Sequence, residues 1–147
     1  MNIITLLKAD HKEVSELFKK LLKSRTTPSK ESVFSKIYEA LTIHAEFEEK
    51  VFYPAVRKSA KTKDLVMESY VEHDLIKTLL SDIKDIPSKD EIWKAKVTVL
   101  EEIIKHHVQE EEQDLFIKSK RILDKEQLKV MGEEYLNFKK DQGNSKN

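Results

Sequence analysis

The chain has 147 residues, with 27 basic and 27 acidic side chains, a formal net charge of zero and no cysteine. Disulfides, thiolate catalysis and cysteine-ligated metal clusters are therefore excluded. Two glycines, three prolines and a charged fraction of 37% favour long helices with solvated outer faces. A balanced charge does not favour a polyanion such as a nucleic acid as a binding partner, because nucleic-acid-binding domains usually carry a basic excess.

The first ten residues lack the charged region and the long apolar core of a signal peptide. No run of about 18 apolar residues predicts a transmembrane helix. We therefore expect a cytoplasmic protein with neither a membrane nor a nucleic acid as its partner.

Apolar residues recur every three or four positions along four long segments, a pattern typical of amphipathic helices. The predicted helices cover 3–24, 29–53, 64–86 and 90–117, and a fifth begins after Asp124. Short links between long helices favour antiparallel neighbours. We predict an all-α fold over residues 1–140, an up-down-up-down antiparallel four-helix bundle with an extra C-terminal helix. Residues 141–147 are expected to be a polar, disordered tail.

Local sequence predicts where these helices begin and end. The residue pairs expected at helix starts are Thr27 with Pro28, Ser88 with Glu91, and Asp124 with Gln127. Pro54 predicts that the second helix ends or kinks near Tyr53, because proline cannot donate a backbone hydrogen bond. A stripe on the fifth helix predicts that it packs on the others; it consists of Leu128, Met131, Tyr135 and Phe138.

One spacing of histidine and glutamate occurs twice. In the first copy, His11 is followed 33 residues later by His44 and, four residues further on, by Glu48. The second copy, offset by 62 or 63 residues, consists of His73, His107 and Glu111. These six residues include four of the five histidines of the chain.

The helical pattern places all six of these side chains toward the core. Residues four apart share one face of a helix, so each histidine–glutamate pair projects together. Buried carboxylates need a compensating positive charge, and no lysine or arginine lies near them on these stripes. Two glutamates can bridge two metal ions. Two histidines per ion, together with an oxo or hydroxo group that bridges the ions, can complete the coordination of each ion. Imidazole and carboxylate ligands suit iron, with manganese or zinc as alternatives.

Four neighbouring residues could alter this ligand set. His106 points about 100° away from His107 on a helical wheel, so we expect it at the surface, although it remains an alternative ligand. Glu46, Glu49 and Glu112 are expected to be solvated, and an extra carboxylate ligand among them is left open.

The segments around these residues resemble the hemerythrin-like (HHE cation-binding) domain family. They are KADHKEVSELF, HAEFEEKVFYP, VEHDLIKTLL and HHVQEEEQDLF, and the resemblance spans roughly residues 3–118. It implies a di-iron helical bundle with His11, His44, Glu48, His73, His107 and Glu111 as ligands. Oxygen-carrying members have a further histidine one turn after the third-helix ligand, where this chain has Lys77.

The resemblance and the residues together predict a non-haem di-iron protein that binds or senses dioxygen, nitric oxide or iron. Lys77 makes reversible oxygen carriage a weaker expectation than sensing, iron handling or defence against peroxide or nitric oxide. An enzyme that decomposes peroxide or reduces nitric oxide at the same centre is one alternative. A metal-free helical interaction module is the other. The sequence therefore leaves open whether the protein is an enzyme.

Overall fold

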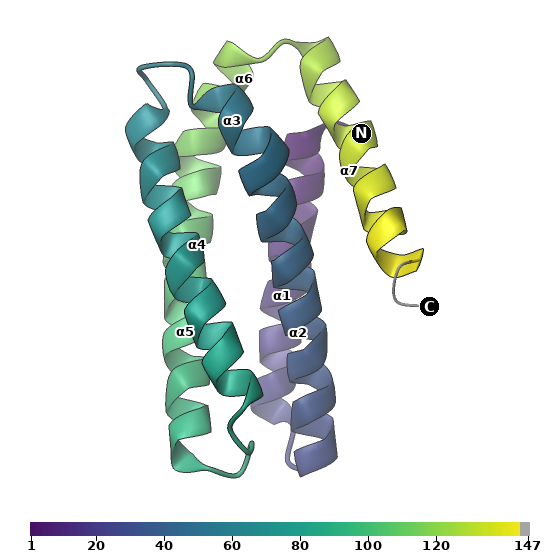
Figure 1. Ribbon diagram of the computed structural model, residues 1–147, viewed down its shortest axis with the longest axis vertical. Coiled ribbons are helices and arrows are strands. Elements are labelled where there is room, and N and C mark those ends of the chain that lie inside the picture. Colours follow the sequence, from purple (N-terminus) through teal and green to yellow (C-terminus); the bar gives the residue numbers. More distant parts are fainter. Residues whose placement is uncertain (145–147) are drawn as a thin grey trace.

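The computed structural model describes residues 1–144, and all regular structure in that range is helical. Four long helices lie side by side and the chain reverses between them (Figure 1); they are α1 (Ile3–Lys23), α2 (Thr27–Phe47), α4 (Lys63–Lys84) and α5 (Glu91–Glu110). No helix of the described part is both long enough and apolar enough to span a membrane. The prediction of an all-α protein is confirmed over these residues.

Two of the predicted helix starts are displaced by one or two residues. Thr26, rather than Thr27, caps α2 and accepts a hydrogen bond from the Ser29 N–H at 3.2 Å. Asp90, rather than Ser88, caps α5 by accepting from the Ile92 N–H at 3.0 Å. Asp90 directly precedes the first turn and can reach that N–H, whereas the predicted Ser88 lies two residues earlier and is buried.

The predicted cap of the last helix is confirmed. This helix, α7, covers Lys125–Asn144. The Asp124 side chain accepts from the Gln127 N–H at 2.8 Å, and the Gln127 side chain accepts from the Asp124 N–H at 2.9 Å. The helix includes residues 141–144, which were expected in the tail, while 145–147 lie outside the described residues.

Pro54 does not end the second helical segment at Tyr53. The chain continues through a π-helical turn (Glu48–Phe52) into α3 (Tyr53–Val56), with proline in the first turn of α3, where its missing N–H is least costly. A second π-helical turn (Glu111–Leu115) joins α5 to α6 (Phe116–Ile122). In each turn the backbone bond spans five residues: Tyr53 N–H donates to the Glu48 carbonyl, and Phe116 N–H donates to the Glu111 carbonyl.

The core consists of two apolar clusters at different heights of the bundle. One lies toward the end that carries α3 and α6, with Leu7, Phe52 and Leu115 among its buried members. The other fills the opposite end, with Val14 and Leu100 among its buried members. Along each long helix, the predicted ligands lie between residues of one cluster and residues of the other. The polar layer is therefore enclosed by apolar packing on both sides.

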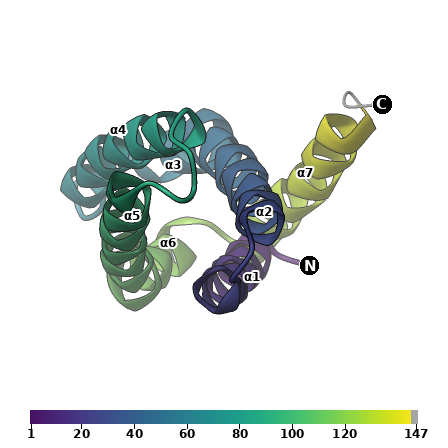
Figure 2. The ribbon, with the colours of Figure 1, turned by 90° about the horizontal axis from the view of Figure 1, so that it is seen from below.

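Helix α7 packs on the outer side of α1 and α2 (Figure 2). Two residues of its predicted stripe are buried, Leu128 and Tyr135, and two are partly buried against the first cluster, Met131 and Phe138. Gly132 allows the close approach to the start of α1, because a Cβ atom there would collide with the Met1 carbonyl oxygen. The expectation that this stripe packs on the other helices is confirmed.

Candidate metal centre

The six predicted ligands come together in the middle of the bundle, one or two from each long helix or the π-helical turn that follows it. Glu48 is 0% and Glu111 1% exposed, and the four histidine side chains are also buried. Their donor atoms form two groups with mutual distances within 4.8 Å, namely His11, His44 and Glu111, and Glu48, His73 and His107. We name them position A and position B.

Each glutamate lies between two histidines. Glu48 Oε1 is 3.2 Å from Nε2 of His44 and 3.2 Å from Nε2 of His73. Glu111 lies 3.2 Å from Nε2 of His11 through Oε1 and 3.4 Å from Nε2 of His107 through Oε2. All four Nε2 atoms therefore face the two central carboxylates, the arrangement expected if each glutamate connects two metal positions.

The other ring nitrogen of every histidine has a carboxylate of its own. Two of these carboxylates directly precede a histidine in the sequence: Asp10 accepts from Nδ1 of His44 at 2.9 Å, and Glu72 accepts from Nδ1 of His107 at 2.8 Å. Such a carboxylate fixes the tautomer of a ligating histidine and increases its basicity.

The other two carboxylates directly follow the central glutamates. Glu49 accepts from Nδ1 of His73 at 2.9 Å, and Glu112 accepts from Nδ1 of His11 at 2.7 Å. Glu49 and Glu112, which were expected to be solvated, are partly exposed at 21% and 35%, and each also orients the ring of a candidate ligand.

These four carboxylates obey the same repeat as the ligands. Asp10 and Glu72 are 62 residues apart, and Glu49 and Glu112 are 63 apart. The acidic residues before His11 and His73, and those after the two central glutamates, were therefore visible in the sequence. Their partners were not, because each hydrogen bond joins two different helices.

Electrostatics ties the buried carboxylates and imidazoles together. Burial would lower the pKa of His44, but Glu48 and Asp10 outweigh it and raise this pKa to about 10. Burial is likewise outweighed at His107, whose pKa is raised well above its ordinary value by Glu111. Burial would raise the pKa of Glu111, but His107 holds it well below the usual range. In the metal-free protein, protons therefore supply the positive charge that this layer needs.

Tyr53 contributes a hydroxyl that the sequence argument missed. It donates to Glu48 Oε1 at 3.0 Å and to Glu111, and it lies 3.2 Å from Nε2 of His73. Burial and the two carboxylates raise its pKa well above 10.0, so the phenol stays protonated. Its place in the centre depends on the π-helical turn, a feature that hydrophobic periodicity does not reveal.

The residues present fit a pair of metal ions. Four buried polar atoms of the centre have no hydrogen-bond partner: Nε2 of His11, Nε2 of His44, Oε2 of Glu48 and Oε1 of Glu111. Buried polar atoms without a hydrogen bond are costly, and three of the four belong to residues of position A, where Nε2 of His11 faces Oε1 of Glu111 at 3.2 Å. No lysine or arginine forms an ion pair with either central glutamate among residues 1–144. Imidazole nitrogens and carboxylate oxygens suit iron, manganese or zinc.

A cavity of about 30 Å3 adjoins the four histidines. The rest of its lining is mostly apolar and includes Val14, Ile76 and Ile104. A water molecule needs roughly 10–15 Å3, so this space can hold a water or a diatomic molecule next to the centre.

The remaining candidates lie outside the centre. His106 is 66% exposed, as expected, and its Nε2 is 3.5 Å from both Glu72 and Glu110. Lys77 forms a surface ion pair with Glu49 at 2.8 Å. Glu46 pairs with Lys50 at 2.6 Å on the surface of α2 and its π-helical turn.

Comparisons with known proteins identify the family of the chain. The family model of the hemerythrin HHE cation-binding domain matches residues 2–118. A DNA nickase from Nostoc sp. (strain PCC 7120) is 36% identical over 135 residues, which cover 92% of this chain and 38% of the relative. The chain thus spans less than half the length of that curated relative.

A solved structure shows the same fold. The crystal structure of a hemerythrin HHE cation-binding domain-containing protein from Mycobacterium kansasii is similar with a TM-score of 0.85 and 20% identity, covering 98% of this chain and 89% of that one. The helical fold, the paired histidines and glutamates and the match over residues 2–118 lead to one assignment. The chain belongs to the hemerythrin HHE cation-binding domain family.

Proposed function

We propose that the protein is an up-down-up-down four-helix bundle, with α7 as an additional outer helix, that holds two iron ions at positions A and B. The ligands in this proposal are His11, His44, Glu48, His73, His107 and Glu111. One observation carries it: donor atoms buried in the centre have no hydrogen-bond partner, and no lysine or arginine within residues 1–144 forms an ion pair with Glu48 or Glu111. Manganese or zinc would satisfy the same donors.

The proposed role is to bind or sense a small ligand, such as dioxygen or nitric oxide, or to handle iron in the cytoplasm. Iron in this site would supply open coordination positions and a change of oxidation state. The chain supplies orientation and exclusion of water: four carboxylates hold the histidine rings, and apolar side chains line the adjoining cavity of about 30 Å3. The DNA nicking named for the Nostoc relative is not part of this proposal, because this chain spans 38% of that protein.

Elemental analysis of the purified protein is the direct test. We expect about two iron ions per chain, an absorption spectrum that responds to dioxygen or nitric oxide, and a rise in melting temperature on metal binding. His106→Ala is the matched control, since His106 is exposed, whereas His107→Ala should lose metal. A folded protein that takes up no metal and melts at the same temperature with and without a chelator would favour the metal-free interaction module.

A second candidate function is an enzyme that decomposes peroxide or reduces nitric oxide at the same centre. The hydroxyl of Tyr53 favours it, because this protonated group lies among the donor atoms and can donate a hydrogen bond to a bound ligand. Turnover that falls in Tyr53→Phe while the metal content stays at the wild-type level would support the enzyme. Binding without turnover in both proteins would support the sensor.

A further inference from the structure

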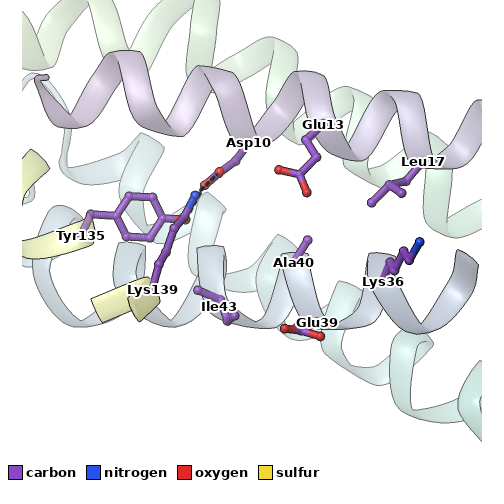
Figure 3. A pocket seen from close by; sticks show the side chains of 9 residues that line it. All are labelled: Asp10, Glu13, Leu17, Lys36, Glu39, Ala40, Ile43, Tyr135 and Lys139. Atoms are coloured by element: carbon purple, nitrogen blue, oxygen red, sulfur yellow. Dashed lines mark hydrogen bonds and ion pairs between the residues drawn. The ribbon is translucent and has the colours of Figure 1, made fainter. Parts of the chain in front are cut away.

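The carboxylates behind His44 and His107 occupy matching places in the repeat but have different surroundings. Asp10 is 8% exposed, and both of its oxygens have partners. Oδ2 accepts from Nδ1 of His44 at 2.9 Å and from the Tyr135 hydroxyl, and Oδ1 accepts from Nζ of Lys139 at 2.6 Å. Figure 3 shows Tyr135 and Lys139 reaching Asp10 from α7 at one end of a groove of about 350 Å3 between α1, α2 and α7.

The matching carboxylate of the second half, Glu72, has no such support. Its Oε1 accepts from Nδ1 of His107 at 2.8 Å, while Oε2 lies 3.5 Å from the ring of exposed His106. Helix α7 lies against α1 and α2, on the side away from α4 and α5 (Figure 2). One half of the centre is therefore braced by a further helix, whereas the second oxygen of Glu72 lies near only exposed histidine and acidic side chains of the described residues.

The side chains of Tyr135 and Lys139, which support Asp10, are themselves held in place by packing. Tyr135 is 0% exposed, and its ring lies 4.6 Å from the ring of Phe47, which is on α2 between His44 and Glu48. Nζ of Lys139 lies 4.5 Å from the centroid of the same tyrosine ring. With donors on both oxygens, the Asp10 carboxylate cannot turn away from His44 without losing a charge-assisted hydrogen bond.

We propose that Tyr135 and Lys139 are positioning residues of the metal centre. They hold Asp10 against His44, so metal affinity at position A depends on the docking of α7, while position B does not. This inference rests on the proposed function, because it assigns unequal support to the two positions. Partners that orient a ligating histidine typically contribute 10–100-fold to metal affinity.

The test compares the two dissociation constants in Lys139→Met and Tyr135→Phe with those of the wild type. Cobalt(II) is the probe, because its visible spectrum reports each occupied position, and competition with a chelator gives the affinities. We expect one of the two ions to bind about 10–100-fold more weakly in each variant, with the other unchanged. Lys139→Arg should restore the affinity.

Two controls separate this role from a general loss of stability. Lys140→Met removes a neighbouring exposed charge of α7 and should leave both affinities unchanged. Circular dichroism melts of the metal-free variants check folding; should Tyr135→Phe unfold, the half-buried Lys139 still provides the test. Equal weakening of both ions, or weakening of neither, overturns the inference alone. A wild type that binds no cobalt overturns the proposed function as well.

Discussion

The two halves of the centre have the same donors in different settings. The half built by α1 and α2 and the half built by α4 and α5 each supply two histidines, one central glutamate and two outer carboxylates. They differ at the residue after each π-helical turn, which is Tyr53 in the first half and Phe116 in the second. They also differ at α7, which backs Asp10 and leaves Glu72 without a counterpart.

This difference shows that a repeat of ligands does not make two equal sites. The Tyr53 hydroxyl contacts Glu48 and His73 of position B and also Glu111 of position A, whereas three donors of position A have no hydrogen-bond partner. The Phe116 ring instead stacks on His11, with centroids 5.8 Å apart and planes 5° from parallel. Position A therefore has more buried donors without a hydrogen bond, and the first half alone supplies a hydroxyl, which reaches both positions.

The largest expected effect is the loss of metal affinity when a central glutamate is replaced. Replacement of either glutamate should have the same result. Glu48→Ala and Glu111→Ala each remove a carboxylate that lies between two histidines, so we expect affinity for both ions to fall by more than roughly 100-fold. Metal content measured after gel filtration checks this. Retention of one full ion in either variant would show that the glutamates do not connect the two positions.

The next largest expected effect is the dependence of the stability of the metal-free protein on pH. The folded-state pKa of His44 is raised from 6.5 to about 10, so its stabilisation is complete below pH 6.5 and is lost as pH rises through about 10. The pKa of Asp10 is lowered to about 2 although burial opposes this, because His44, Lys139 and Tyr135 stabilise the carboxylate. Its contribution is present above pH 3.8 and is lost as pH falls through about 2.

Thermal melts in the presence of a chelator measure this profile. We expect the highest melting temperature between about pH 4 and 6.5 and a decline toward pH 10. Metal affinity should rise over the same range, because a ligating histidine must be deprotonated. A flat profile in the wild type would contradict the raised pKa of His44.

Exchanging Tyr53 and Phe116, the residues after the two π-helical turns, tests whether the two halves differ because of the Tyr53 hydroxyl. Tyr53→Phe removes hydrogen bonds to buried carboxylates, and we expect the metal-free protein to lose about 1–3 kcal/mol of unfolding free energy. Denaturant titration of chelated protein gives that value. Phe116→Tyr is the matched variant, because it places a hydroxyl at the same position of the second half. If the double variant Tyr53→Phe, Phe116→Tyr regains the unfolding free energy of the wild type, the hydroxyl acts equally from either half.

The last expected effect, no larger than that of Tyr53→Phe, concerns the docking of α7. Gly132→Ala places a Cβ against the Met1 carbonyl, so we expect it to cost about 1–3 kcal/mol and to weaken one metal position. Gly143 has no atom within 4 Å of the place of its Cβ, so Gly143→Ala should be neutral or slightly stabilising. Equal stability of the two variants would show that α7 can shift at no cost.

Periodicity predicted the helices and the meeting of the six candidate ligands, because the apolar residues and the ligands share the same faces. It could not predict the residues whose role depends on contacts between helices. Tyr135 and Asp10 are 125 positions apart, and no local pattern announces that contact. Pro54 correctly indicated an irregularity near Tyr53 but not its place or form, since the irregularity begins at Glu48 and proline is accommodated in the turn that follows.

The two π-helical turns each accommodate one extra residue. Deleting one residue between Glu48 and Tyr53 would convert the turn to ordinary α-helix and leave Tyr53 in place, because its N–H already bonds to the Glu48 carbonyl. Each residue of an α-helix advances the direction of the side chain by about 100°. If the turn became ordinary α-helix with every residue kept, Phe52 would take the place of Tyr53 next to the metal positions without a change in any ligand.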